Sequence, residues 1–303
     1  MYEEFYGFYE KPFTLTPDPK FFFMSEDHFS ALEHLLFGIN QGEGFLVLAG
    51  GVGTGKTTLS KIILDKVKNN YVTSLILNPF VNEIELLSSI IYDFGCIPEG
   101  VTKKELIDQL NFFLLKEVAE KGKRAILIID EAQNLSFEVL EQIRILSNLE
   151  TDKEKLIQIL LVGQEELLKK LARPELRQLN GRIPIKYYLL PLKKKEIESY
   201  ILHRLRVAGM KKKLDFSKGA IKEIYKFSKG IPRQINIICD RALLAGFVKN
   251  TYKIKKEMIK KARRSLVGEK EKELKNLLKR EKRFFFTFFK KKYSININNS
   301  KEE

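Results

Sequence analysis

GGVGTGKT, at residues 50–57, is the most informative segment of the chain. It fits the phosphate-binding pattern G-x-x-x-x-G-K-[ST], and it lies between the apolar run FLVLA at 45–49 and a helical pattern that begins at Lys56. Glycines in such a strand-loop-helix unit let successive backbone N–H groups point at the β- and γ-phosphates of a nucleotide, and the helix N-terminus adds partial positive charge. The segment therefore predicts a loop that binds a nucleotide by its phosphates.

Two side chains of this loop have specific roles in phosphoryl transfer. We expect Lys56 to contact the β- and γ-phosphates and Thr57 to ligate Mg²⁺, so ATP and Mg²⁺ are the predicted cofactors. The predicted nucleotide-binding residues of the loop are Gly50, Gly51, Val52, Gly53, Thr54, Gly55, Lys56, Thr57 and Thr58.

The run AILIIDE at 125–131 supplies the carboxylates that this chemistry needs. A metal-side carboxylate should end an apolar strand, so that it points at the loop from the carboxyl edge of the neighbouring strand. We expect Asp130 to hold Mg²⁺ through water and Glu131 to polarise the water that attacks the γ-phosphate. The sequence thus predicts ATP hydrolysis.

The other apolar runs predict an α/β domain. Five β-rich runs occupy 45–49, 71–79, 124–130, 155–163 and 183–190, and two stretches with helical spacing separate the second run from the third. Strands that are apolar on both faces and alternate with helices indicate a parallel sheet covered on both sides. We expect a P-loop NTPase αβα sandwich around a five-stranded parallel sheet.

After Pro191 the pattern changes to helices alone, at about 193–208, 217–229, 232–249 and 254–265. Beyond Val267 the sequence is charged, then aromatic, then Asn-rich. We therefore predict an N-terminal lead and helix at 1–42, the α/β ATPase domain at 43–192, a small all-helical lid domain at 193–266, and a basic aromatic tail at 267–303 outside the core.

Composition excludes several classes of protein. With 44% hydrophobic and 31% charged residues over 303 positions, the chain is neither wholly disordered nor collagen-like. Two Cys and three scattered His offer neither a disulfide framework nor a zinc cage. No apolar run approaches the roughly 20 residues that span a bilayer, and the N-terminus is acidic and aromatic, so we expect a cytoplasmic protein.

The net charge of +15 is unevenly distributed. Residues 249–303 hold 19 Lys and Arg against 7 Asp and Glu, whereas the first 248 residues hold 35 against 32, so we expect the tail to meet anionic partners. Within it, KREKRFFFTFFKKK at 279–292 brackets five Phe with basic residues, which suits peripheral contact with an anionic inner-membrane surface. Single-stranded nucleic acid and a disordered, partner-docking tail are the alternatives.

The tandem acids, the two helices before the third strand and the helical domain together resemble the AAA+ ATPases. More narrowly, the stretch at 12–59 looks like the family of general secretion pathway protein A, and IIDEAQNLS at 128–136, LVGQEEL at 161–167, LRQLNGRIPIKYYLLPL at 176–192 and GIPRQIN at 230–236 extend the match. The resemblance covers about 5–265. It implies an ATPase of type II secretion or type IV pilus biogenesis, and related ATPases that regulate transposition share much of this core.

The resemblance also implies roles for residues outside the two motifs. Gln164 matches the polar sensor that reads the γ-phosphate, and Arg233 sits where a second sensor on the lid would reach back to the nucleotide. Arg182 matches the arginine that a neighbouring subunit inserts into the active site, with Arg177 as the alternative. These matches imply an ATP-dependent homo-oligomer.

The N-terminal lead is implied to lie against the adenine. Phe13, Pro17 and Pro19 give it an apolar, proline-stiffened character that suits a flat base, although ordinary packing of an N-terminal arm explains these residues equally well. His28 and His34 fall on the following helical pattern, and we assign them no role.

Three functions stay open at this point. The first is an AAA+ ATPase that drives remodelling or assembly of a secretion, pilus or cell-envelope complex. The second is a DNA-associated regulator of transposition or recombination. The small net charge of the first 248 residues offers little reason for a DNA-binding surface, so it weakly favours the first function over the second. The third is a nucleotide-dependent scaffold without turnover, which the intact Lys56, Asp130, Glu131 and Arg182 disfavour.

Overall fold

The structure is a computed structural model that describes the whole chain except residues 1, 78, 151–154, 212–213, 267 and 269–303. The predicted basic aromatic tail therefore lies outside the described residues. Among the described residues, no helix is both long enough and apolar enough to cross a membrane.

The five predicted parallel strands are confirmed as one sheet in the order β2-β3-β4-β1-β5. Their bounds are β1 Phe45–Gly50, β2 Tyr71–Ile76, β3 Arg124–Ile129, β4 Ile157–Gly163 and β5 Ile185–Leu189. Three of these strands, β1, β3 and β4, are almost wholly buried, because side chains of both faces enter a core. Strand β4 lies between β1 and β3.

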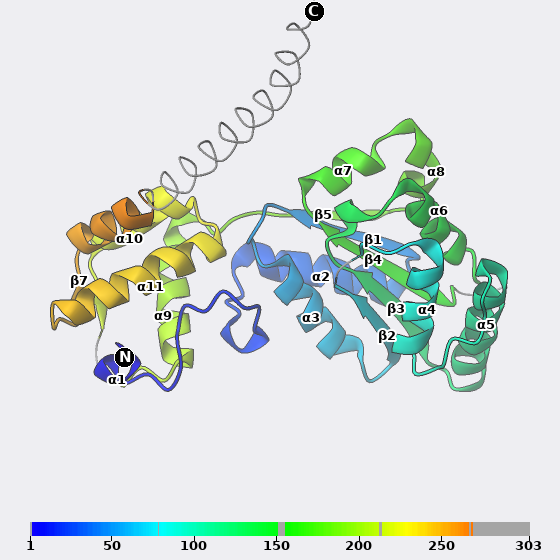
Figure 1. The fold of residues 1–303 in the computed structure, drawn as a ribbon, viewed down its shortest axis with the longest axis horizontal. Helices are drawn as coiled ribbons and strands as arrows, with labels where there is room; N and C mark the ends of the chain where they lie inside the picture. Colours follow the sequence, from blue (N-terminus) through cyan, green and yellow to red (C-terminus); the bar gives the residue numbers. More distant parts are fainter. Residues whose placement is uncertain (1, 78, 151–154, 212–213, 267, 269–303) are drawn as a thin grey trace, which may run out of the picture.

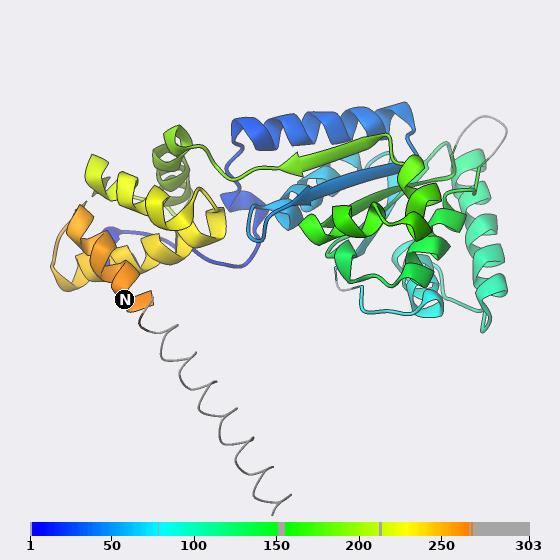
Figure 2. The ribbon, with the colours of Figure 1, turned by 90° about the horizontal axis from the view of Figure 1, so that it is seen from above.

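Helices cover both faces of the sheet (Figures 1 and 2). One face packs against α2 (Glu26–Gln41) and α3 (Lys56–Val67), whose apolar residues meet Leu46 and Leu48 of β1. The opposite face meets Phe45 and Val47 of the same strand. Its helices are α4 (Glu83–Asp93), α5 (Lys103–Leu115), α6 (Phe137–Leu146), α7 (Glu165–Leu171) and α8 (Arg177–Gly181).

The two helices expected between the second and third strands are present, and each begins with a capping box. Asn82 and Glu85 cap α4, and Thr102 and Glu105 cap α5. Short helical turns in the sheet domain are η2 (Lys116–Glu120), η3 (Ala132–Asn134) and η4 (Pro174–Leu176), while η1 (Pro19–Phe21) lies in the N-terminal arm and η5 (Lys194–Glu196) at the start of the lid.

The lid domain (193–266) packs three helices around a separate core: α9 (Ile197–Val207), α10 (Lys218–Ser228) and α11 (Pro232–Val248), with a further helical stretch at 256–266. It differs from the expectation of helices alone in one detail. Strands β6 (Asp215–Phe216) and β7 (Lys253–Ile254) form a parallel pair that joins the start of α10 to the segment before the last helix. Two-residue strands carry too little periodicity to be recognised in a sequence.

The predicted unit at 1–42 divides between the two domains. Helix α1 (Tyr2–Tyr6) and the arm that follows, up to Phe23, pack into the lid core, as the Tyr6 hydroxyl group shows by donating to the Leu243 carbonyl at 3.0 Å. Helix α2 instead packs on the sheet. The dark blue arm in Figure 1 accordingly runs from the lid helices to the helix that covers the sheet.

Candidate functional site

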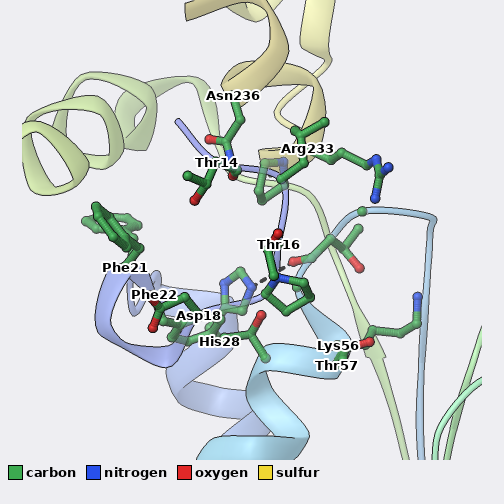
Figure 3. Close-up of a pocket in the computed structure, with 18 of the residues that line it drawn as sticks. Thr14, Thr16, Asp18, Phe21, Phe22, His28, Lys56, Thr57, Arg233 and Asn236 are labelled. Carbon is green, nitrogen blue, oxygen red and sulfur yellow. Dashed lines mark hydrogen bonds between the residues drawn. The ribbon is translucent and has the colours of Figure 1, made fainter. Parts of the chain in front are cut away.

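A pocket lies where the carboxyl ends of the strands meet the lid domain and the N-terminal arm. Most of its lining comes from three parts of the chain: the glycine-rich loop with the start of α3, the arm at 14–23, and lid helices α9 and α11. His28, Glu131, Gln164 and Leu192 complete the lining. Figure 3 shows Lys56 and Thr57 on the sheet side, with Arg233 and Asn236 facing them from the lid. Such a cleft between two domains is a frequent place for a ligand.

The loop between β1 and α3 has the backbone that phosphate binding needs. Gly53 and Gly55 have φ values of 77° and 106°, in the left-handed region that favours glycine. A side chain at Gly50 would place its Cβ 2.7 Å from the Leu189 carbonyl oxygen, and one at Gly53 would come within 2.6 Å of the Arg233 Cβ. Gly50 is therefore required by the close approach of β5, and Gly53 by the close approach of the lid.

Lys56 opens α3 with its side chain folded back over the loop. Its Nζ donates to the carbonyl oxygens of Gly50 at 2.9 Å and Gly51 at 3.0 Å. Burial lowers the pKa of this ammonium group, while the nearby Glu131 and Asp130 carboxylates raise it. A buried ammonium group that faces a pocket is well suited to bind phosphate oxygens, so the residues fit a nucleoside triphosphate.

Asp130 and Thr57 meet as expected, although across an intervening strand. The Thr57 hydroxyl group donates to Asp130 Oδ2 at 2.5 Å. Thr57 lies at the start of the helix that follows β1, and Asp130 follows β3, so β4 lies between the two strands. The expectation that Asp130 approaches from the strand next to β1 is therefore wrong. Burial raises the pKa of Asp130. One hydroxyl and one carboxylate oxygen fit Mg²⁺, which prefers oxygen ligands and takes the rest from phosphates and water.

Glu131 follows in an unusual backbone conformation. Its φ of 51° is in the left-handed region, which costs a non-glycine residue about 1–2 kcal/mol. Its N–H donates to Asp130 Oδ1 at 2.8 Å. Two side-chain amides hold its carboxylate, because Gln133 Nε2 donates to Oε2 at 2.6 Å and Gln164 Nε2 donates to the same oxygen at 3.0 Å. The strained turn thus aims a fixed carboxylate at the pocket, of which Glu131 is a lining residue.

Gln164 and Arg233 both line the pocket, as their predicted sensor roles require. Gln164 begins α7 directly after β4, and its backbone N–H donates to Gln133 Oε1 at 3.0 Å. Arg233 lies in the first turn of α11, and its N–H donates to the Gly53 carbonyl at 3.3 Å. The lid is therefore hydrogen-bonded to the phosphate loop itself.

Gln133 is a site residue that sequence reasoning missed. It belongs to the quoted segment IIDEAQNLS, and its amide connects Glu131 to the backbone of Gln164. The usable signal was an amide side chain two residues after the second acid. The left-handed turn at Glu131, which brings the two side chains together, could not be seen in the sequence.

The arm lines the pocket, but Phe13 does not. Phe13 is buried in the lid core and is absent from the pocket lining, so the prediction that it faces the adenine is wrong. An apolar ring packs better among the lid's aliphatic side chains than at a half-open cleft. The lining contributed by the arm is instead Thr14, Leu15, Thr16, Pro17, Asp18, Phe21, Phe22 and Phe23. Pro19 begins η1 beside it.

Three lid side chains hold the arm in place. Arg204 Nε donates to the Pro12 carbonyl at 2.6 Å, and Asn236 Nδ2 donates to the Thr14 carbonyl at 3.0 Å. The Tyr200 hydroxyl group donates to Asn236 Oδ1 at 2.7 Å, which fixes the amide orientation. All three side chains are buried, and the Arg204 guanidinium lies 4.8 Å from the centre of the Phe21 ring. Sequence patterns gave no signal for this network.

His28 joins the arm and α2 to the phosphate loop. Its Nε2 donates to the Thr54 carbonyl at 2.9 Å, so the neutral ring accepts at Nδ1 from the Ser25 hydroxyl group, 2.6 Å away. Phe22 packs edge-on against the ring. Burial lowers the pKa of His28. The ring is only 2% exposed and lines the pocket, whereas His34 is exposed.

The two arginines proposed to act on a neighbouring subunit lie away from this pocket. Arg182 is exposed between α8 and β5, and its guanidinium donates to Asn148 Oδ1 and to Ser147 Oγ, the latter at 3.2 Å. Arg177 is exposed at the start of α8. Neither lines the pocket of its own chain.

Comparisons with known proteins agree with this geometry. Residues 39–171 match the AAA domain family. Over 255 residues the chain is 44% identical to general secretion pathway protein A of Aeromonas hydrophila, an alignment that covers 84% of this chain and 46% of that protein. The chain thus spans about half the length of this curated relative.

Solved structures share the fold. The chain resembles the ORC2 protein of Aeropyrum pernix in its ADP form, with a TM-score of 0.63 and 16% identity over 84% of this chain and 72% of the other. It also resembles the RuvB branch migration motor of Thermotoga maritima, with a TM-score of 0.54 and 21% identity over 80% and 69% of the two chains. At these identities the likeness shows the fold alone. By the AAA domain match and the 44% identity, the chain belongs to the AAA+ family, in the branch of general secretion pathway protein A.

Proposed function

We propose that this chain binds Mg-ATP in the pocket and hydrolyses the nucleotide. The observation that carries the proposal is the Glu131 carboxylate, which two amides hold at the wall of a pocket that also contains Lys56. When bound, ATP supplies the transferable γ-phosphoryl group and Mg²⁺ neutralises part of its charge. Fixed groups around a reacting phosphate are the main source of rate in such enzymes.

Each residue then has one task. Lys56 would bind the phosphates, and Thr57 and Asp130 would hold the metal. Glu131 would accept a hydrogen bond from the attacking water and orient this water toward phosphorus. Gln164, which also lines the pocket, would contact the γ-phosphate as a sensor.

The position of the pocket supports a mechanical use of hydrolysis. The phosphate loop belongs to the sheet domain, whereas the arm that lines the pocket is fastened to the lid by Arg204 and Asn236. A nucleotide that contacts both sides stabilises one arrangement of the two domains, and loss of the γ-phosphate removes part of that stabilisation. Hydrolysis would thereby move the lid.

We propose further that the chain works as a homo-oligomer in which Arg182 completes the site of a neighbouring copy. The exposure of this side chain and its distance from its own pocket support the role. A trans-acting arginine contributes about 10³ to 10⁵ in rate in related systems. The 44% identity with general secretion pathway protein A supports remodelling or assembly of a secretion, pilus or cell-envelope complex as the process.

The hydrolysis proposal is tested by two variants with different expected defects. Lys56→Ala should abolish tight ATP binding, because Lys56 contacts phosphates already in the ground state. Glu131→Gln should keep ATP affinity near the wild-type value but stop phosphate release, because Glu131 acts on the water only as bonds rearrange. Equal ATP affinity in Lys56→Ala and the wild type would overturn the assignment of the pocket.

A further inference from the structure

The lid domain carries the positive charge of the described chain. Residues 193–266 hold 22 Lys and Arg against 6 Asp and Glu, while residues 1–192 hold 21 against 27. Residues 267–303 hold 11 against 6. These counts correct the expectation that basicity is a property of the tail, because the excess of acids in residues 1–192 offsets a strongly basic lid in the sum over the first 248 residues.

Four lysines of this excess form a stripe on α10. Lys218, Lys222, Lys226 and Lys229 are all exposed. The spacing of four residues places the first three on one face of the helix, and Lys229 follows as its C-cap residue in the left-handed conformation. At a rise of about 1.5 Å per residue the three helical lysines span about 12 Å. The opposite face of α10 is buried in the lid core through Ala220 and Ile224.

The last lid helix extends this surface. Lys256 lies beside α10, since a Cβ at Gly219 would be 3.4 Å from the Lys256 Cβ. Strand β7 meets the start of α10, because the Ser217 N–H donates to the Ile254 carbonyl at 3.0 Å. We call the whole surface the lysine face, made of Lys218, Lys222, Lys226, Lys229, Lys253, Lys255, Lys256 and Lys260, all exposed.

Little negative charge offsets the lysine face. The Glu223 carboxylate is 3.8 Å from the Lys256 ammonium group and 4.0 Å from that of Lys226, and its side chain is 9% exposed. This single carboxylate can neutralise only one of the eight lysine charges.

Of the other lid acids in the described part, Glu196 is buried and bonded to the Lys193 N–H, and the Asp240 carboxylate accepts from Tyr2. The remaining three, Glu198, Asp215 and Glu257, are exposed; Asp215 pairs with Lys253 between β6 and β7, and Glu257 directly follows Lys256. Eight exposed lysines against these few acids still leave the face a cationic surface.

The nucleotide pocket does not use this surface. The lid residues that line the pocket come from α9, α11 and the segment at Leu192, and none comes from α10. A partner on the lysine face would leave the pocket accessible. The two surfaces can therefore be tested separately.

We propose that the lysine face docks the lid on a bilayer of anionic lipid. Lysines are mobile point charges that need no fixed partner geometry, which suits a fluid array of headgroup phosphates. Further along the sequence, residues 279–292 hold five Phe between basic residues, a composition that suits the headgroup region of a bilayer.

The expected loss of vesicle binding can be worked out from the lysine charges alone. Each Lys near an anionic surface strengthens binding several-fold, and the effect falls off within about 10 Å at ordinary salt. Removing the four charges of α10 should therefore weaken partitioning at least about tenfold. Conversion to Arg keeps the charge and should keep binding.

The experiment measures cosedimentation of the full chain with phosphatidylcholine vesicles that contain about one third phosphatidylglycerol. The test variant changes Lys218, Lys222, Lys226 and Lys229 to Gln. The matched control changes four exposed lysines of the sheet domain, Lys66, Lys104, Lys116 and Lys123, to Gln. A third variant changes the four α10 lysines to Arg, and ATP affinity is measured for every protein.

We expect the α10 Gln variant to lose at least tenfold in binding, with the sheet-domain control, the Arg variant and all ATP affinities near wild type. Equal binding by the α10 Gln variant and the wild type would overturn the proposal, as would an equal loss in the sheet-domain control. A wild-type chain that ignores these vesicles but binds duplex DNA with a steep salt dependence would replace lipid by nucleic acid as the partner. None of these results depends on whether ATP is hydrolysed.

Discussion

Replacing His28 by Leu tests whether this ring positions the phosphate loop. Leu keeps most of the volume but cannot donate to the Thr54 carbonyl, which the ring now binds at 2.9 Å. Thr54 is fully buried, so its carbonyl would lose a partner without gaining water, at a cost of about 1–3 kcal/mol. For a chain of 303 residues, the entropy of unfolding is about 0.6 kcal/mol/K, so about 2 kcal/mol lowers the melting temperature by about 3 °C.

ATP affinity should fall together with stability. Thr54 lies in the loop between Gly53 and Gly55, so an untethered carbonyl allows the neighbouring N–H groups to leave the phosphate-binding geometry. We expect ATP to bind about tenfold more weakly, a difference of about 1.4 kcal/mol. The matched control is His34→Leu on the exposed face of the same helix, which should change neither quantity. A His28→Leu protein with wild-type ATP affinity and melting temperature would refute the positioning role.

The pH dependence supplies a second readout. Burial lowers the pKa of His28 in the folded chain, whereas the unfolded chain takes up the proton at about pH 6.5. Below that pH the unfolded state binds more protons than the folded state, so this group makes stability fall as the pH falls through about 6.5 toward the folded pKa. His28→Leu lacks this contribution, so the stability gap between wild type and variant should narrow from pH 7.5 to pH 5.5 in denaturant titrations.

Two further predictions concern the groups that hold Glu131 and the arm. Gln133→Leu should leave ATP affinity unchanged and lower turnover about tenfold or more, because Glu131 loses one of its two amide donors; unchanged phosphate release would show that the amide does not position the carboxylate. Arg204→Met should weaken ATP binding about tenfold and lower the melting temperature, because a buried charged donor leaves the Pro12 carbonyl. Arg204→Lys should rescue little, because one ammonium cannot replace the planar fork that reaches both Pro12 and Thr14; full rescue by Lys would contradict that geometry.

The parts of the fold that local chemistry dictates were predictable. The glycine pattern at 50–57 needs no distant partner to be recognised, and buried parallel strands have continuous apolar runs. The acids at Asp130 and Glu131 were found because they end such a run. The strand order was not accessible in the same way, since apolar runs do not specify their neighbours, and β4 therefore lies unexpectedly between β1 and β3.

What the sequence could not provide are contacts between segments far apart in the chain. Phe13 packs in a core that the N-terminal arm shares with lid residues from Leu192 onward, so its burial depends on a domain that follows the arm by almost two hundred residues. Arg204 likewise holds the arm across that separation. His28 reads as an ordinary helix residue until the loop at Thr54 is placed beside it.

The shared, hydrolytic site is tested most directly by mixing two inactive variants. Arg182→Ala and Glu131→Gln should each lack ATP turnover alone, the first because neighbouring sites lose their arginine and the second because its own site lacks the carboxylate. In mixed oligomers some interfaces pair an intact Glu131 with an intact Arg182 from the other copy. We expect phosphate release to recover in the mixture, up to about a quarter of the wild-type rate if copies mix at random in equal amounts. Absence of recovery in oligomers shown to contain both variants would contradict a site completed by Arg182 of a neighbouring copy.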